Sequence, residues 1–225
     1  MNHLKLFENF EITDPILYGE PLNNKEINIL KGYNIICPEF ILKDDNYYYV
    51  HDHRCENIKD VPLTYINGLC SKYNIVNYTI NDDYTIDVNG DVSFYIKGLS
   101  KIPLKFNIVS GNFSCAFNKL ITLEGSPKSV GGYFSCYSNQ LTTLEGAPKS
   151  VGGDFDCSHN KLTTLKGSPK RVGRCFKCHT NQLTTLEGSP KHIGLDLDCR
   201  DNPLTSIEYK GSFGSFIPFA IISDM

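Results

Sequence analysis

Residues 130–150 read VGGYFSCYSNQLTTLEGAPKS, and five successive copies of this pattern occur in a chain of 225 residues. The copies begin at Val109, Val130, Val151, Val172 and Ile193, so the period is 21 residues without an insertion. A weaker copy precedes them from residue 88 onward. A fixed period of about 20 to 50 residues is typical of solenoids, in which each unit buries its apolar side against its neighbours.

The repeat predicts which side chains form the core. Each copy has Phe or Leu followed two residues later by Cys, and alternate side chains of a strand share a face. We therefore expect a buried Phe column and a buried column of Cys115, Cys136, Cys157, Cys178 and Cys199. Leu141, Leu144 and their equivalents are expected to point inward beside them. The Asn that follows each Cys by three residues is expected to stack and to bond backbone groups of adjacent coils.

A possible cofactor motif lies in the fourth copy. Residues 175–179 read CFKCH, a spacing that attaches c-type haem or supplies half of a zinc site. The repeat already accounts for Cys178, and Cys175 is expected on the opposite face of the strand. Nine cysteines is an odd number, and parallel Cβ vectors do not suit a disulfide. We therefore predict reduced thiols, no haem, no metal and no other cofactor.

The second half of each copy, LTxLEGxPK, is short and contains Gly and Pro, which excludes a regular helix. The combined pattern VxxxFxCxxNxLxxL resembles the leucine-rich repeat over residues 88–210. It is similar to the short repeats of secreted bacterial effectors and of proteins from tailed phages and giant viruses. The resemblance implies a β-rich solenoid, a leucine-rich-repeat-like right-handed coil of about six turns, and a phage or viral source.

The parts that flank the repeats are expected to cover the ends of the solenoid. Residues 77–94, NYTINDDYTIDVNGDVSF, predict a hairpin that leads into the first coil. The C-terminal GSFGSFIPFAIISDM is interpreted as a hydrophobic cap, with contact to a partner as the alternative. In the first 75 residues, EINILKGY and PLTYINGLCSKY have partial helical spacing and NYYYV predicts a strand. The predicted domains are a small α+β domain with the capping hairpin, residues 1–87, and the solenoid, residues 88–225.

The charge distribution argues against a nucleic-acid partner. Residues 1–87 hold 7 Lys and Arg against 14 Asp and Glu, a net charge of −7, and residues 88–225 carry a net charge of +4. A nucleic-acid-binding domain is expected to be far more basic. No apolar run is long enough to span a membrane, and Glu8 and Glu11 interrupt the place of a signal peptide. We expect a cytoplasmic protein, in the host cytoplasm or in the virion if viral.

The outward strand positions change from copy to copy, whereas the core and return positions hardly change. This contrast favours a protein-binding surface on the concave strand face, and drift at solvent positions is the alternative. The exposed Glu and Lys of the return segment face water too and stay constant. The predicted partner-binding residues are Tyr133, Tyr137, Asp154, Asp156, Lys177, His179, Asp196, Asp198 and Arg200.

These patterns predict a non-enzymatic recognition module that binds and modulates a host or partner protein, without catalytic residues. One alternative is an enzyme or metal-binding N-terminal domain at residues 51–55, HDHRC, which the solenoid would target. Another is a structural virion component, suggested by the leader MNHLKLFENF. The sequence leaves the identity of the partner and the oligomeric state open.

Overall fold

The computed structural model describes residues 40–43, 46–49, 61–206, 208, 211–212 and 215–217. The chain divides into two compact units, Met1–Tyr65 and Ile66–Met225. In the first unit, β1 (Phe40–Lys43) and β2 (Asn46–Tyr49) pair antiparallel, which confirms the strand predicted at NYYYV. The segments EINILKGY and HDHRC and the N-terminal leader lie outside the described residues.

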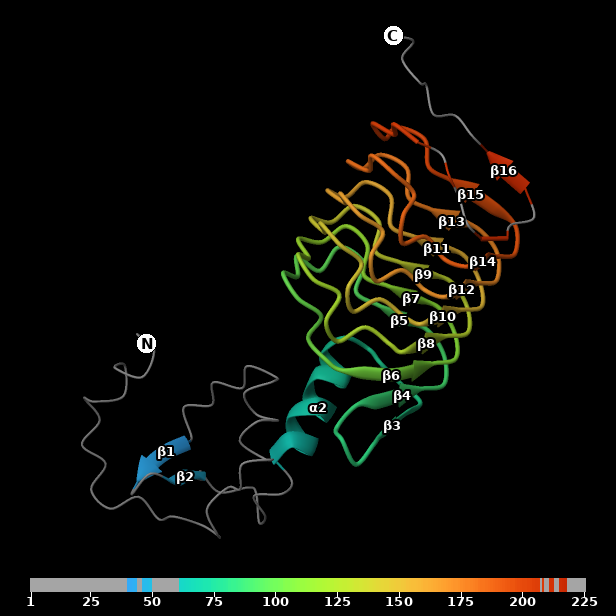
Figure 1. The fold of residues 1–225 in the computed structure, drawn as a ribbon. Helices are drawn as coiled ribbons and strands as arrows, with labels where there is room; N and C mark the ends of the chain where they lie inside the picture. The colour runs from blue at the N-terminus through green and yellow to red at the C-terminus, as the bar shows by residue number, and fades with distance from the viewer. Residues whose placement is uncertain are drawn as a thin grey trace. The chain divides into compact units, whose positions relative to one another are not determined.

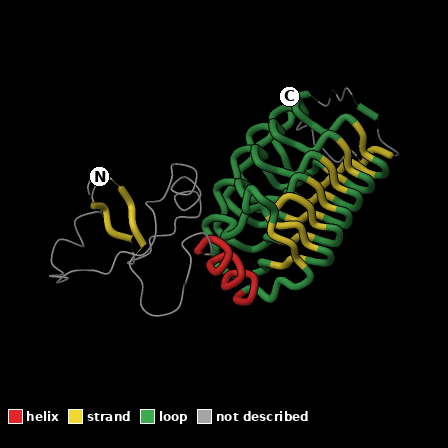
Figure 2. The backbone as a smooth tube through the Cα atoms, turned by 90° about the horizontal axis from the view of Figure 1, so that it is seen from below, coloured by secondary structure: helices red, strands yellow, loops and turns green. Residues whose placement is uncertain are grey.

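Helix α2 (Val61–Lys72) confirms the helical spacing of PLTYINGLCSKY. Its residues Ile66 and Cys70 are four apart, so they lie on one face of the helix, and both are buried. The helix ends at Lys72 and is followed by a turn in which Asn74 has a left-handed φ of 54°. The ring of Tyr73, in this turn, meets the ring of Phe94 edge-on at 5.1 Å. The end of the helix therefore covers the core of the first coil (Figure 2).

The predicted hairpin is present and leads directly into the solenoid. Strands β3 (Tyr78–Ile80) and β4 (Ile86–Val88) pair antiparallel on either side of a turn at residues 81–85. The Asp83 carboxylate accepts hydrogen bonds from the backbone N–H and the hydroxyl of Thr85, at 3.1 and 2.6 Å. Strand β4 then pairs in parallel with the next strand of the solenoid. The compact second unit thus includes the hairpin as well as the repeats.

The second unit is a β-solenoid of stacked parallel strands, as predicted (Figure 1). Each repeat contributes one short strand to each of two sheets. The first sheet is completed by β6 (Phe106–Val109), β8 (Ser129–Val130), β10 (Ser150–Val151), β12 (Arg171–Val172) and β14 (His192–Ile193). The second sheet contains β5 (Val92–Ser93), β7 (Phe113–Ser114), β9 (Phe134–Ser135), β11 (Phe155–Asp156), β13 (Phe176–Lys177), β15 (Asp196–Asp198) and β16 (Ser215–Ile217).

The division of each repeat into two strands differs from the single strand that the sequence predicted. The corner between them lies at Gly131 and Gly132 and at the equivalent residues. A Cβ atom on Gly131 would lie 2.1 Å from the carbonyl oxygen of Ser110 in the preceding coil. The coils approach each other so closely here that a side chain does not fit, and the chain turns from one sheet to the other.

The predicted core columns are confirmed. Phe134, Cys136, Leu141 and Leu144 are fully buried, as are their equivalents in the middle copies. The rings of Phe113, Phe134, Phe155 and Phe176 stack at centroid distances of 5.1 to 5.4 Å. All seven cysteines in the described part of the chain are free thiols.

The asparagine ladder is also confirmed. The Nδ2 of Asn160 donates to the carbonyl oxygens of Cys157, in its own coil, and of Cys136, in the preceding coil, at 3.1 and 3.0 Å. Its Oδ1 accepts from the backbone N–H of Leu141 at 3.0 Å. The other four asparagines repeat the bonds to the two Cys-position carbonyls or their equivalents. Each Asn therefore joins two coils through backbone groups that would otherwise be buried without partners.

At the C-terminal end, β16 pairs in parallel with β15 and extends the second sheet. The backbone of the predicted cap thus continues the stack at the residues that the structure describes. The apolar residues at 219, 221 and 222, which the cap interpretation and its alternative invoke, lie outside those residues.

The buried thiols should be unreactive in the folded protein. Burial raises the pKa of the Cys115 thiol to about 12, and burial raises the pKa values of Cys136, Cys157 and Cys178 well above the ordinary value. Because the thiolate is the reactive form, a maleimide at neutral pH should modify half-buried Cys175 before any of these. Peptide mapping by mass spectrometry, with and without denaturant, measures the order. Rapid modification of Cys136 or Cys157 in the native protein would contradict the burial.

Candidate functional site

The nine predicted partner-binding residues lie along the second sheet, at three positions of the repeat. Tyr133, Asp154 and Asp196 precede the Phe or Leu column, Asp156, Lys177 and Asp198 lie between this column and the Cys column, and Tyr137, His179 and Arg200 follow the Cys column. We call this set the strand face. Its members alternate with the buried columns, as predicted, but their exposure differs widely: Tyr133 and Arg200 are exposed, whereas Asp198 is only 9% exposed.

Several acidic residues of the strand face bond to the backbone. The Asp154 carboxylate accepts from the N–H of Cys175 in the next coil at 3.1 Å, as Asn112 accepts from the N–H of Tyr133 at 2.9 Å. Asp156 accepts from the N–H of Ser158 at 3.0 Å. These side chains stabilise the coil locally, so part of the variation at the strand face has a structural reason.

Basic residues meet Asp154 across the coils. Its carboxylate lies 3.7 Å from the Nζ of Lys177 and 3.4 Å from the Nε of Arg174, a residue that the sequence did not single out. These ion pairs are solvent-accessible, so each contributes at most about 1 kcal/mol to stability.

Asp198 and Arg200 form a closer pair. The Nε and Nη2 of Arg200 donate to the two carboxylate oxygens of Asp198 at 2.9 and 2.7 Å. Partial burial raises the pKa of Asp198, but the hydrogen bonds and the charge of Arg200 outweigh it and hold this pKa below its ordinary value. Arg200 is therefore held in place by Asp198.

Replacement of Arg200 by alanine should raise the pKa of Asp198, because burial remains while the donors are lost. In the native protein the lowered pKa means that the pair stabilises the fold above about pH 4 and that this contribution is lost as the pH falls through the folded-state pKa. Titration of side-chain carboxyl carbons by NMR measures the change. Lys177→Ala is the control, since Lys177 contacts Asp154 and should leave Asp198 unaffected. An unchanged Asp198 pKa in Arg200→Ala would contradict the assignment.

The structure adds a feature that the sequence analysis missed, a row of rings that crosses the coils. Tyr95, Phe117, Tyr137, His159 and His179 each contact the next, with centroid distances between 4.8 and 5.3 Å. We call this row the ring ladder. The rings occupy the residue after the Cys column in one coil and the residue before the Asn in the next coil.

In the coils whose ring lies just before the Asn, the residue after the Cys column is small. Ala116 and Ser158 occupy the same repeat position as Tyr137 and His179, which alternation predicts to face outward, but they are buried, at 4% and 0% exposure. Each directly precedes a ladder ring, Phe117 or His159, and the left-handed φ of these two residues, 55°, redirects their side chains. Ser114, also expected outward, is buried as well. A reading of both positions together, with a ring in one and a small residue in the other, would have found the ladder.

The two cysteines of the CFKCH motif are separated, as predicted. Cys178 is fully buried in its column, whereas the Sγ of Cys175 lies 3.7 Å from the Oδ2 of Asp196. In the part of the chain that the structure describes, no group of three or more His, Cys, Asp or Glu residues is arranged to hold a metal ion. The HDHRC stretch is outside that part.

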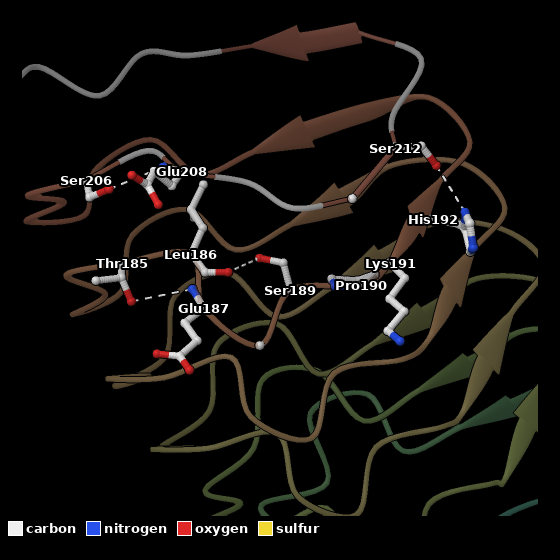
Figure 3. A pocket seen from close by; sticks show the side chains of 12 residues that line it. Thr185, Leu186, Glu187, Ser189, Pro190, Lys191, His192, Ser206, Glu208 and Ser212 are labelled. Atoms are coloured by element: carbon white, nitrogen blue, oxygen red, sulfur yellow. Dashed lines mark hydrogen bonds between the residues drawn. The ribbon is translucent and has the colours of Figure 1, made fainter.

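A cavity of about 900 Å³ lies beside the last coil (Figure 3). Its lining includes Glu187, Lys191, His192, Glu208 and Ser212. The Nδ1 of His192 and the hydroxyl of Ser212 lie 3.0 Å apart, in hydrogen-bonding distance. The cavity is located where the last copy departs from the LTxLEGxPK pattern and reads LTSIEYKGS. Apolar residues, Leu186 and Pro190, also line the cavity, so its surface is of mixed polarity.

Comparison with known proteins gives no match among family models, curated proteins or solved structures. No helix within the described residues is long and apolar enough to cross a membrane. The fold itself defines the class of this chain, a repeat protein built as a β-solenoid of 21-residue coils.

Proposed function

We propose that this chain is a non-enzymatic recognition module that binds another protein through the strand face. The observation that supports this is the contrast within one chain between constant core and return positions and variable side chains on a rigid sheet. Part of the variation is accounted for by Asp154, Asp156 and Asp198, which bond locally. Within the described residues, the side chains of Tyr133, Tyr137, Lys177 and His179 make no such hydrogen bond to the backbone. Tyr is also enriched in protein interfaces.

The size of the strand face suits a small interface. The four coils that carry the strand face are about 4.8 Å apart and extend over about 14 Å, whereas a standard interface buries about 800 Å² on each partner. The ring ladder lies beside the strand face and shares Tyr137 and His179 with it, so it would enlarge the contact. As part of the same proposal, we infer that the chain is related to leucine-rich-repeat proteins, comes from a phage or virus and acts in the cytoplasm.

Affinity capture from lysate of the organism that encodes the chain tests the proposal. Tyr137→Ala should weaken binding of the captured protein by about 1 to 3 kcal/mol, because aromatic anchors dominate such contacts. Thermal unfolding should change little, since Tyr137 is only half-buried. The matched control combines Lys128→Ala, Lys149→Ala and Lys170→Ala on the exposed return segments. Loss of binding in the lysine variant alone would place the functional surface on the return side.

The two alternative functions depend on residues outside the described part. Metal analysis of the purified full-length protein addresses the HDHRC stretch, because stoichiometric zinc or iron would favour a metal-binding N-terminal domain. Detection of the chain in purified particles would favour a virion component.

A further inference from the structure

Several apolar side chains in and beside the ring ladder are exposed to solvent and do not contribute to the buried core. Tyr95 is 49% exposed, its neighbour Ile96 is 61% exposed and Phe117 is 44% exposed. Within the described residues these are three of the eight large hydrophobic side chains that are exposed. The three lie in two adjacent coils and continue into Tyr137 through ring contacts, so they form one strip and not scattered positions.

The ring ladder has a period of two coils. Tyr95, Tyr137 and His179 occupy one repeat position in every second coil, and Phe117 and His159 occupy the other position in the coils between. Since stacked strands are about 4.8 Å apart, equivalent rings recur about every 9.6 Å along the solenoid. A polyproline II helix has three residues per turn and rises about 3.1 Å per residue, so its own repeat is about 9.3 Å. An extended β-strand repeats every 6.6 to 6.8 Å, roughly, and does not match.

The polar residues beside the ladder alternate with the same period. The residue that follows the Asn of the asparagine ladder is Lys119, Gln140, Lys161 or Gln182 in successive coils, and all four are exposed. A polyproline II segment makes no internal hydrogen bonds, so its carbonyl groups accept from such donors. The lysines add positive charge along this flank. On the other flank, Arg200 offsets the charge of Asp198, while Asp156, which accepts from the N–H of Ser158, keeps its negative charge. The two lysines therefore favour an acidic ligand that lies along their own flank of the rings.

We propose that the ring ladder binds an acidic, proline-rich segment of a partner protein in the polyproline II conformation, lying across the coils with one ligand turn for every two coils. This inference rests on the proposed function and names the chemistry of its partner. Proline-rich segments bind aromatic-lined grooves elsewhere because their preformed helix loses little entropy on binding. A nucleic-acid strand fits less well, because the rings meet one another at interplanar angles of 52° to 86° and offer no parallel platform for bases.

Fluorescence anisotropy with the full-length protein tests this inference. The probe is a labelled peptide of about ten prolines flanked by glutamates, long enough to cover three turns. The control peptide keeps the glutamates and replaces the prolines by glycine and serine. We expect saturable binding of the proline peptide at least about tenfold tighter than that of the control peptide, and weaker binding at high salt. Equal binding of both peptides, absence of binding, or tighter binding of a single-stranded oligonucleotide would overturn the inference.

Variants locate the binding surface. Phe117→Ala and Tyr137→Ala should each weaken proline-peptide binding by about fivefold or more. Ile108→Ala is the control, because Ile108 is 47% exposed and lies outside both the ring ladder and the strand face. Lys119→Glu combined with Lys161→Glu changes only exposed side chains, so it should reduce binding without affecting the fold. An equal effect of Ile108→Ala, or no effect of the lysine variant, contradicts the placement.

The two proposals fail in different ways. If the proline peptide does not bind while Tyr137→Ala still releases the captured protein, the polyproline II ligand is wrong and the recognition function stands. If Tyr137→Ala affects neither the peptide nor the captured protein, both are wrong.

Discussion

Gly152→Ala is expected to destabilise the solenoid by more than about 3 kcal/mol, the largest effect of any single substitution considered for this chain. A Cβ atom at this position would lie 2.1 Å from the carbonyl oxygen of Gly131 in the preceding coil. The obstacle is backbone, which cannot rotate away as a side chain can. The N–H of Gly152 also donates to the carbonyl of Val130 at 2.9 Å, so separation of the coils would break that bond.

Gly68→Ala provides the matched control. Gly68 lies in helix α2, is exposed and has no atom within 4 Å of an added Cβ. Alanine there should stabilise the protein by about 0.5 to 1 kcal/mol, because glycine is unfavourable inside a helix. Urea denaturation followed by circular dichroism compares the two variants with the parent. Equal stability of Gly152→Ala and the parent would show that the coils are farther apart at the corner than described.

The corner between the two sheets, at Gly131, Gly152 and their equivalents, shows which structural features the repeat predicts and which it does not. Columns of Phe, Cys and Leu follow from the period alone, because a residue that recurs every 21 positions must stack on its copies. At least one glycine recurs at this corner in every copy, and a pair of glycines in the second and third copies, but the structural role of these glycines depends on the distance between coils. That distance becomes apparent only when a hypothetical Cβ at Gly131 or Gly152 is placed against the neighbouring backbone. The strands of the first sheet, such as β8 and β10, were missed for this reason.

The sequence predicted which residues form the strand face, but not their contacts with neighbouring coils. Alternation correctly placed Tyr133 and Lys177 away from the core columns. It failed at Ala116 and Ser158, which are buried. The residue after each has a left-handed φ and carries a ring that contacts the rings of both neighbouring coils. The bonds of Asp154 to the next coil also depend on stacking geometry. Contacts between coils therefore decide which variable residues support the fold and which remain available to a partner.

Leu144→Ala should cost about 2 to 5 kcal/mol, because it removes a fully buried side chain from a packed column and leaves a cavity. Leu165→Ala, the same position one coil later, should cost about as much. Ile121→Ala is the control, since Ile121 is 68% exposed and its truncation should change stability by less than about 0.5 kcal/mol. A cost near zero for Leu144→Ala would show that the return segment does not pack into the core.

The position of the coil in the stack should modulate this cost. Each coil of a solenoid contacts only its two neighbours, so a leucine in the middle of the stack packs against coils on both sides. Leu162 is fully buried in the third copy, whereas Leu204 occupies the same repeat position in the last copy and is 8% exposed. We therefore expect Leu204→Ala to cost clearly less than Leu162→Ala in urea denaturation. Equal costs would mean that the segment after the last copy covers Leu204 as completely as another coil would, and would support the interpretation of the apolar C-terminal residues as a cap.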